Sequence, residues 1–468
     1  EEDAELPDAA DDGADGESGE DGDGFESEWD ADGGDADDTG DGETEADGDA
    51  GTGCVHGATC TAVSPGVCLS GACALRYLGE GTGDRFGRRV SLAPWQDGLV
   101  SDVLVGAVFP WPGVLGAGYH LSTSGARRHV WLGAPSEGLG DAVAAGSDAD
   151  GDTHRELLVG GSQLGVSGAG GRVHVYDAAD GVELLTLSAP TAGEAFGAAV
   201  AWGADATGDG FDDFAVGAPN YDGGSGAVGR AYLYNGISHA RAATMDGARS
   251  GAAFGWSVTV APRSVWSGAT GGGVLAGALL EPAGGRAQAG CAYLYVNATT
   301  TRDLVWWDCG ADTNWFYGTS VALADDLDGD GHEEFAVGAP GYLANTGRVF
   351  VYDATGRVAY DWSGETPDAE FGFSVSAGPD ATGDPGAVGD IVVGAPGHGA
   401  DRGRVYLYAG ESGAVFRAWD GEELGDRFGT AVSLGGDADG DTLADVLIGA
   451  PDHSGDTGAA YLLRSVDW

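Results

Sequence analysis

The amino-acid sequence predicts an all-β chain that folds as a seven-bladed β-propeller, and three observations carry this prediction. A large hydrophobic residue followed by glycine recurs seven times, at intervals of 53 to 63 residues. Each interval holds strand-length runs rich in Val, Tyr, Phe and Leu, bounded by Gly, Asp and Pro. No segment shows a convincing amphipathic-helix period. Four short strands per unit, repeated seven times, are typical of sheets that pack face to face around an axis.

An acidic segment precedes the repeats. Glu1 to Ala50 contain 24 carboxylates and no basic residue, so they cannot bury enough apolar surface to offset the entropy of ordering. We expect residues 1–53 to form a disordered tail. The whole chain has 75 acidic and 21 basic residues and a formal net charge of −54. This charge excludes nucleic acid as a favoured partner and makes divalent cations favourable ones. The chain has no 18-residue apolar run, so we expect no membrane insertion.

A cysteine-rich segment, residues 54–73, follows the tail. It contains Cys54, Cys60, Cys68 and Cys73 among small and turn-forming residues, and it is too short for a hydrophobic core. We expect two disulfides of open connectivity, because the spacing lacks the paired Cys-x-x-Cys pattern of zinc sites. Disulfides imply an oxidising compartment, so we expect an extracellular or cell-surface protein. A removed signal peptide would explain the start at Glu1, as would a trimmed chain.

The repeats fill residues 74–468. Their paired residues are Phe86-Gly87, Leu139-Gly140, Phe196-Gly197, Phe254-Gly255, Tyr317-Gly318, Phe371-Gly372 and Phe428-Gly429. Within each unit a second run ends in Gly-Ala-Pro or a relic of it, and a third run is apolar at consecutive positions, as in GRVFVYDA. Consecutive apolar residues are expected where neighbouring sheets cover both faces of a sheet.

The seventh unit lacks a fourth run, because the chain ends just after its third one. Near the N-terminus, Leu75 to Leu78 precede a Gly-Asp-Arg-Phe-Gly phrase that also follows the fourth run of unit six. We therefore expect Leu75 to Leu78 to be the fourth strand of blade seven, which would close the ring and remove an open edge.

Cys291 and Cys309 flank the third and fourth runs of unit four. A hairpin centred on Thr300 would place them opposite one another, within disulfide range. The alternative is a pair of buried free thiols.

A charged loop of regular design joins the first and second runs of five units. Oxygen-bearing side chains stand at positions one, three, five and nine, glycine stands at position four, and a backbone carbonyl at position seven can help. The candidate ligands are Asp148, Asp150, Asp152, His154 and Glu156; Asp205, Thr207, Asp209, Phe211 and Asp213; Asp326, Asp328, Asp330, His332 and Glu334; Asp380, Thr382, Asp384 and Asp390; and Asp437, Asp439, Asp441, Leu443 and Asp445. Such ligands suit Ca²⁺ better than Mg²⁺, because calcium accepts more oxygens and irregular geometry. The alternative is an Asp-Gly turn with solvated carboxylates, but five repeats of the design favour about five calcium sites. Units one and four carry no such loop.

At these motifs the chain resembles the FG-GAP repeat family, the seven-bladed propeller of integrin α subunits and its bacterial relatives. The resemblance covers about 390 residues. It implies calcium in the first inter-strand loops on one face of the disc and ligands on the opposite face. The tail and cysteine segment lie outside it and look like the stalk of a bacterial surface protein.

We therefore expect a secreted or surface-displayed adhesion module that binds a protein or a glycan. Loops between the second and third runs would carry the ligand face, with Phe109, Trp111, Tyr221 and Tyr342 as candidates, because exposed aromatics give contact area at low entropic cost. One alternative is a structural subunit of an extracellular fibre or surface layer that assembles with itself. Another is a polysaccharide-active enzyme, which we disfavour because the nine histidines are scattered and the paired acids are accounted for as metal ligands.

Overall fold

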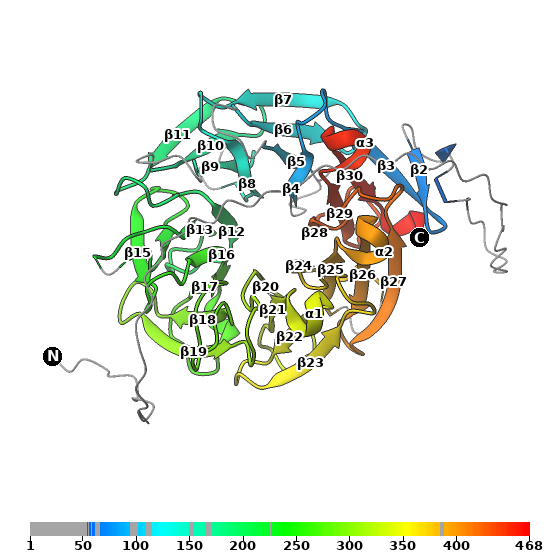
Figure 1. Cartoon of the computed structure of the whole chain (residues 1–468). Coiled ribbons are helices and arrows are strands. Elements are labelled where there is room, and N and C mark those ends of the chain that lie inside the picture. The colour runs from blue at the N-terminus through cyan, green and yellow to red at the C-terminus, as the bar shows by residue number, and fades with distance from the viewer. Residues whose placement is uncertain are drawn as a thin grey trace, which may run out of the picture. The chain divides into compact units, whose positions relative to one another are not determined.

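The computed structural model describes residues 54, 56–57, 59–60, 66–93, 102–108, 115–148, 154–163, 170–224, 226–383 and 388–468. Seven antiparallel sheets form a ring around a central opening (Figure 1). The predicted seven-bladed β-propeller is confirmed. The predicted acidic tail lies outside the described residues.

Each blade is a four-stranded meander whose first strand lies nearest the axis (Figure 1). The strands of blades one to three are β4 (Phe86–Leu92), β5 (Asp102–Ala107), β6 (Ala117–Ser122), β7 (Arg127–Leu132), β8 (Leu139–Ala145), β9 (Glu156–Gly161), β10 (Arg172–Asp177), β11 (Glu183–Ser188), β12 (Ala199–Gly203), β13 (Asp213–Ala218), β14 (Arg230–Tyr234) and β15 (Arg241–Asp246). Those of blades four to six are β16 (Phe254–Ala261), β17 (Gly273–Ala278), β18 (Cys291–Val296), β19 (Asp303–Cys309), β20 (Ser320–Leu323), β21 (Phe335–Ala339), β22 (Arg348–Tyr352), β23 (Val358–Ser363), β24 (Ser374–Gly378), β25 (Asp390–Ala395), β26 (Arg404–Ala409) and β27 (Ala414–Asp420). The seventh sheet has the order β1 (Thr59–Cys60), β2 (Gly66–Leu69), β3 (Ala72–Leu78), β30 (Ala459–Leu463), β29 (Asp445–Ala450) and β28 (Ala431–Gly435).

The core lies between neighbouring blades. Leu233 of blade three and Val274 of blade four, for example, belong to one buried cluster. The second strands are buried along their whole length, as in β25 and β29, which is why their sequences are apolar at consecutive positions. The fourth strands alternate half-buried and exposed residues over most of their length, because only one of their faces meets the ring.

The hydrophobic residue of each repeat motif holds one blade against the previous one. Phe371 is fully buried and meets Tyr406 of its own blade edge to face, with ring centroids 5.3 Å apart. Its backbone also bridges to Gly347 of the preceding blade. Gly347 has φ +84°, and a Cβ there would lie 2.1 Å from the Phe371 carbonyl oxygen. This close backbone approach therefore requires glycine.

The N-terminal strand closes the ring as predicted. β3 pairs with β30 from Ala74 opposite Leu463 to Leu78 opposite Ala459, and Phe86 bridges to Gly458 of the last blade. The blade-seven sheet is thus built from both ends of the propeller sequence.

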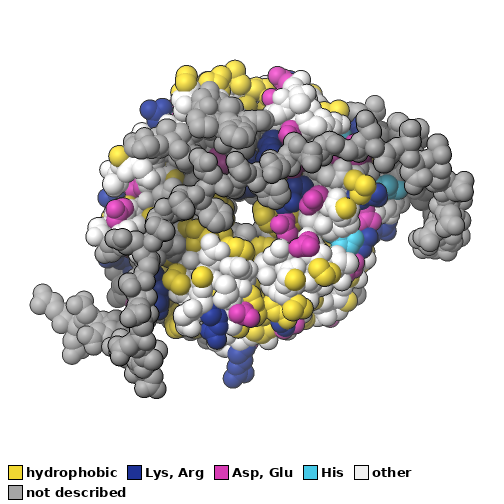
Figure 2. Space-filling model, viewed as in Figure 1, with side chains coloured by type: hydrophobic (Ala, Val, Ile, Leu, Met, Phe, Trp, Pro, Cys, Tyr) yellow, Lys and Arg dark blue, Asp and Glu magenta, His cyan; other side chains and the backbone are white. Residues whose placement is uncertain are grey.

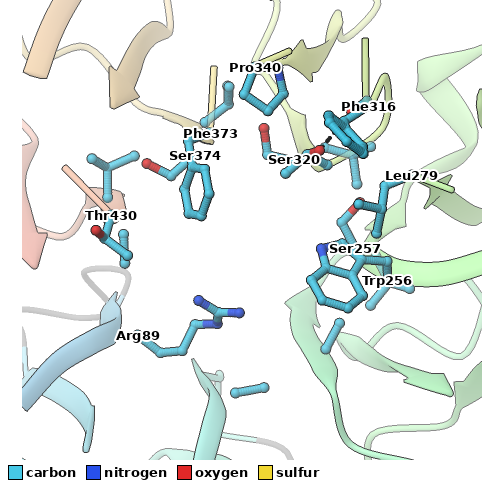
Figure 3. Close-up of a pocket in the computed structure, with 18 of the residues that line it drawn as sticks. Arg89, Trp256, Ser257, Leu279, Phe316, Ser320, Pro340, Phe373, Ser374 and Thr430 are labelled. Carbon is cyan, nitrogen blue, oxygen red and sulfur yellow. Dashed lines mark hydrogen bonds between the residues drawn. The ribbon is translucent and has the colours of Figure 1, made fainter. Parts of the chain in front are cut away.

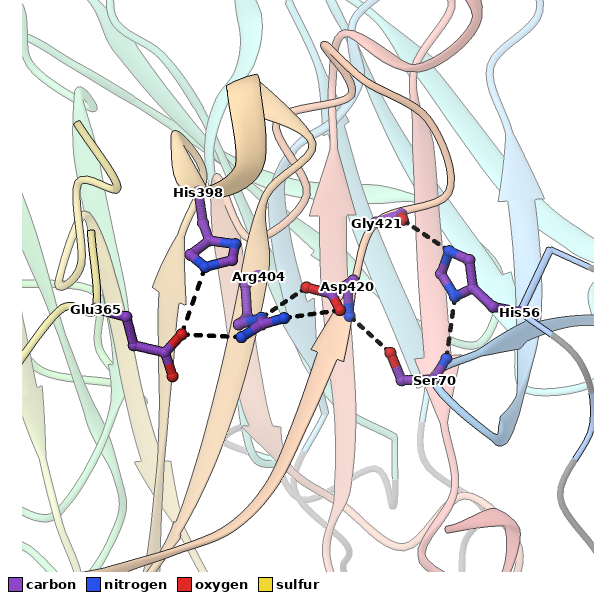
Figure 4. Close-up of polar contacts among 7 residues, drawn as sticks. All are labelled: His56, Ser70, Glu365, His398, Arg404, Asp420 and Gly421. Carbon is purple, nitrogen blue, oxygen red and sulfur yellow. Dashed lines mark hydrogen bonds and ion pairs between the residues drawn. The ribbon is translucent and has the colours of Figure 1, made fainter. Parts of the chain in front are cut away.

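The cysteine-rich segment extends this closing sheet outward, since β2 pairs with β3 and β1 with β2. Cys54 and Cys68 form a disulfide, and Cys73 is also disulfide-bonded. Polar contacts fasten the segment to blade six (Figure 4): the Asp420 N–H donates to Ser70 Oγ at 3.1 Å, and a ring nitrogen of His56 lies 3.1 Å from the Gly421 carbonyl. Arg404 continues the chain of contacts by pairing with both Asp420 and Glu365.

Helical structure in the described residues is limited to single turns. They are η1 (Arg263–Val265), α1 (Tyr342–Asn345), α2 (His398–Asp401), α3 (His453–Asp456) and η2 (Ser465–Asp467). None of the helical turns in the described residues is long and apolar enough to cross a bilayer.

Candidate cation loops and the opposite face

The acidic loops lie at one end of the blades, between the first and second strands. Their last acid stands at the start of the second strand, as Asp213 of β13, Asp390 of β25 and Asp445 of β29 do. The carboxylate is therefore fixed by a buried strand while the rest of the loop folds over it. The loops between second and third strands emerge at the other end.

The loop of blade five brings three carboxylates together. Asp326, Asp328 and Glu334 each offer an oxygen within 4.8 Å of the others. Backbone amides shape the loop: Leu327 N–H donates to Glu334 Oε2 at 2.6 Å, and Gly329 N–H donates to Asp326 Oδ1 at 2.7 Å. Positions one and nine thus hold the turn, and Gly331 N–H donates to the second Asp326 oxygen at 2.8 Å.

Blade seven repeats this arrangement with different residues. Asp437, Asp439 and Asp445 form the second such cluster. Ala438 N–H donates to Asp445 Oδ2 at 2.6 Å, and Gly440 N–H donates to Asp437 Oδ1 at 2.6 Å. The same hydrogen bonds at the same loop positions indicate one design, which the sequence spacing predicted.

Both clusters fit a hard cation. Glu334 Oε1 and Asp439 Oδ2 are buried oxygens without a hydrogen-bond partner among the described residues, and an unpaired buried carboxylate oxygen is costly. Burial, with a smaller contribution from nearby acids including Asp328, raises the pKa of Glu334 to about 7 against the lowering effect of the Leu327 N–H. Burial likewise raises the pKa of Asp445 to about 7. Each loop therefore holds more buried negative charge than its own hydrogen bonds compensate.

Blade three departs from this arrangement. Asp205 and Asp213 hold the turn as in the other blades, but position three is Thr207, and the Asn235 side-chain amide donates to Thr207 Oγ1 at 3.1 Å and to Asp209. Burial raises the pKa of Asp213 to about 6. Here a side-chain amide already contacts oxygens that the sequence assigns to a cation.

Blade six brings its late acid into the loop despite the two-residue extension. Thr382 N–H donates to Asp380 Oδ1 at 3.0 Å and to Asp390 Oδ2 at 2.9 Å. Asp384 lies outside the described residues.

Blade two is described only in part. Glu156 is buried at the start of β9, Asp148 is half-buried and His154 is exposed. Asp150 and Asp152 lie outside the described residues.

Blade four has no acidic loop, and other contacts organise it. The turn η1 buries Val265 in the core shared with blade five. Cys291 and Cys309 are directly opposed on β18 and β19 and form the predicted disulfide, with Cα atoms 4.0 Å apart.

On the opposite face, two of the proposed ligand residues pack against arginines. The Arg230 guanidinium carbon lies 3.6 Å from the centroid of the Tyr221 ring, and Arg348 donates to the Tyr342 hydroxyl at 3.3 Å. Both tyrosines are half-buried. Phe109 and Trp111 lie outside the described residues.

The sequence interpretation missed Leu343, next to Tyr342. Leu343 is 67% exposed, and its φ of 43° is unusual for a bulky residue. The matching turns of blades six and seven have Gly399 and Ser454 at this position, also with positive φ. Aligning the three turns by sequence would have singled out the leucine, because small residues suit this backbone better.

Comparison with known proteins agrees with this geometry. The FG-GAP repeat family matches residues 196–234, 317–352 and 428–463, which run from the motif to the third strand of blades three, five and seven. The chain is 36% identical to mouse integrin alpha-E over 172 residues, 36% identical to Xenopus laevis integrin alpha-5 over 149 residues, and 34% identical to human integrin alpha-IIb over 162 residues. These matches cover 29 to 32% of this chain and only 14 to 15% of each relative. The chain thus carries FG-GAP repeats in a seven-bladed propeller similar to that of integrin α subunits.

Proposed function

We propose that this propeller is a secreted or cell-surface adhesion module that binds calcium in its acidic loops and a protein or glycan through the opposite face. The observation that carries the proposal is the pair of three-carboxylate clusters in blades five and seven, each with a buried, unpaired oxygen. Their donors are oxygens only, which favours calcium or magnesium over softer metals. We further propose calcium in the other acidic loops, about five sites in all.

The proposed role of calcium is structural. A bound cation would neutralise the buried acids and fix each loop between its first and second strands. The integrin names of the relatives support adhesion, and the disulfides support an oxidising compartment. We propose binding rather than catalysis.

The exposed leucine of blade five is the sharpest probe of the ligand face. Purified full-length chain in calcium would be screened against arrays of glycans and extracellular-matrix proteins, with Leu343→Ser as the test variant. Serine occurs at the matching position of blade seven, so the turn should fold. The matched control is Leu184→Ser, on the outer strand β11, where the leucine is also exposed.

We expect Leu343→Ser to weaken binding about thirtyfold, on the scale of an interface hot spot, while Leu184→Ser binds like the parent. Equal binding by all three proteins would remove the blade-five loop from the ligand face. Filaments in electron micrographs, with no array binding, would favour the structural-subunit alternative.

A further inference from the structure

The ring encloses a central cavity of about 470 Å³. Its walls are the starts of the innermost strands, and loops from the face opposite the acidic loops contribute Leu279, Phe316 and Pro340. Figure 3 shows these side chains around an open centre, with the Arg89 side chain extending into it. The cavity is separate from the cation loops. Gly341 and Asn345, at the two ends of the turn that carries Leu343, line it, but Leu343 itself does not.

Arg89 breaks the repeat at this cavity. In six blades the second residue after the motif glycine is small: it is Ala142, Ala199, Ser257, Ser320, Ser374 or Ala431. The serines have a structural use, since Ser320 Oγ donates to the Gly372 carbonyl of the next blade at 2.9 Å, and Ser374 Oγ donates to Gly429 at 2.8 Å. Blade one places an arginine where the packing of the ring elsewhere uses only alanine or serine.

The Arg89 guanidinium has little compensation for its charge. Its one hydrogen bond within the described part of the chain goes from Nη1 to the Arg88 carbonyl, at 3.1 Å, and no described carboxylate forms an ion pair with it. Two nearby acids are already engaged: Asp141 accepts from Ser162 and lies 3.9 Å from Arg88, and Glu370 pairs with Arg427.

The surroundings of Arg89 are unfavourable for a cation. Burial and, to a smaller extent, the charge of Arg88 lower the pKa of Arg89 to about 10, and Asp141 offsets this only in part. Arg89 is deep in the ring yet keeps partial exposure, because it faces the cavity. The side chain therefore remains protonated at neutral pH, and no carboxylate in the described part of the chain neutralises its charge.

The rest of the wall is mostly aromatic and apolar, with serine and threonine hydroxyls, Asn345 and Glu370, whose carboxylate pairs with Arg427. Trp256 and Phe373 stand across the opening from one another, and Phe316 adds a third ring to the wall (Figure 3). A planar guanidinium binds a carboxylate through two parallel N–H donors. Aromatic walls favour a ligand whose charge is attached to an apolar body.

We propose that the central cavity binds a carboxylate carried on an apolar or aromatic body, with Arg89 pairing the carboxylate and Trp256 and Phe373 contacting the body. The source is either a free organic acid or an acidic side chain of a partner that enters along the axis. A single small acid or a single side chain suits a cavity of this size. Binding in the cavity does not require the adhesion site proposed for the loops. Either proposal can therefore be rejected without rejecting the other.

Matched probes test the charge. Isothermal titration of the full chain in calcium would compare N-acetylphenylalanine with its neutral amide, and a capped Gly-Phe-Asp-Gly peptide with the corresponding Asn peptide. The test variant is Arg89→Ser, because serine stands at the same position in three other blades and should fold. The control is Arg263→Gln, which removes an exposed arginine from η1 near the acidic loops. Thermal melts would verify folding.

We expect at least one acidic probe to bind, its neutral partner to bind at least tenfold more weakly, and Arg89→Ser to lose the same factor while Arg263→Gln does not. Binding by the free acid alone would identify a small-molecule site, and binding by the peptide alone a partner site. Equal binding of acid and amide, unchanged binding by folded Arg89→Ser, or no binding of any probe at 10 mM would overturn the proposal.

Discussion

Blades four and five are neighbours in the ring, yet their loops between first and second strands are organised in different ways. Blade five gathers Asp326, Asp328 and Glu334 around a centre with a buried, unpaired oxygen. Blade four has the short turn η1 at this place and a disulfide between its two outer strands. Two sheets of the same design are thus stabilised in different ways. Blade five has a carboxylate cluster that fits a cation, whereas blade four relies on packing and a disulfide.

The difference stops at the loops, because the interface between the two blades is ordinary apolar packing. Trp306 of blade four meets Phe335 and Tyr352 of blade five, each with ring centroids 4.7 Å apart. The packing between these two blades is therefore apolar whichever way their loops are organised, and only the loop ends of the sheets differ in chemistry.

Removal of calcium should have the largest effect, and it should act on blade five and not on blade four. For a site with free calcium at 100 times Kd, chelation removes about 2.7 kcal/mol of stability, and several sites are emptied together. We expect chelation to lower the melting temperature, calcium to restore it, and magnesium to restore less. Hydrogen exchange should locate the loosening in blades five and seven. An unchanged melting curve after exhaustive chelation would reject the cation assignment.

Removal of the blade-four disulfide should come next. The double variant Cys291→Ala with Cys309→Ala opens a link that spans 18 residues, and chain entropy predicts a loss of about 3 kcal/mol. Because blade four has no acidic loop, the shift on chelation should be the same in this variant as in the parent.

The double variant Cys54→Ala with Cys68→Ala, at the outer edge of the blade-seven sheet, is the matched control and should destabilise the ring less. If chelation no longer lowers the melting temperature once the blade-four disulfide is removed, the disulfide and the cation sites do not stabilise the ring independently.

The sequence predicted the features that depend on local motifs, and it missed those that depend on distant contacts. Ring closure and the Cys291–Cys309 pairing follow from counting strands and from hairpin register. The contact of Asn235 with the blade-three loop could not be predicted, because Asn235 follows the third strand, more than 20 residues from Asp209. The solitary charge of Arg89 also emerges only when seven blades share one axis.

The variant Glu334→Gln should separate a cation ligand from a simple loop cap. With calcium, loss of a ligand charge should cost about 2 kcal/mol, within the usual range for a buried polar change. Without calcium the sign should reverse: glutamine keeps an oxygen for the Leu327 N–H and removes a buried charge near Asp326 and Asp328, which should stabilise the loop by about 1 kcal/mol.

Glu411→Gln, at an exposed turn of blade six, is the control and should change neither melting curve by much. Equal destabilisation of Glu334→Gln with and without calcium would mean that Glu334 only caps the turn.

The smallest expected effect concerns Ser264, through which the turn η1 of blade four contacts the acidic loop of blade five. Ser264 of η1 donates its hydroxyl to Glu333 Oε1 at 2.8 Å, and its carbonyl lies 2.8 Å from His332 Nδ1. Ser264→Ala should cost about 1 kcal/mol, the usual net value of such a hydrogen bond. Because His332 holds position seven of the blade-five loop, the variant should also raise the calcium concentration at half-saturation, by about twofold, in a titration followed by melting temperature. Ser267→Ala, exposed and nearby, should do neither. If Ser264→Ala lowers stability equally at every calcium concentration, the turn of blade four stabilises the ring but does not help the blade-five loop to bind the cation. The two loops would then act independently although they are in contact.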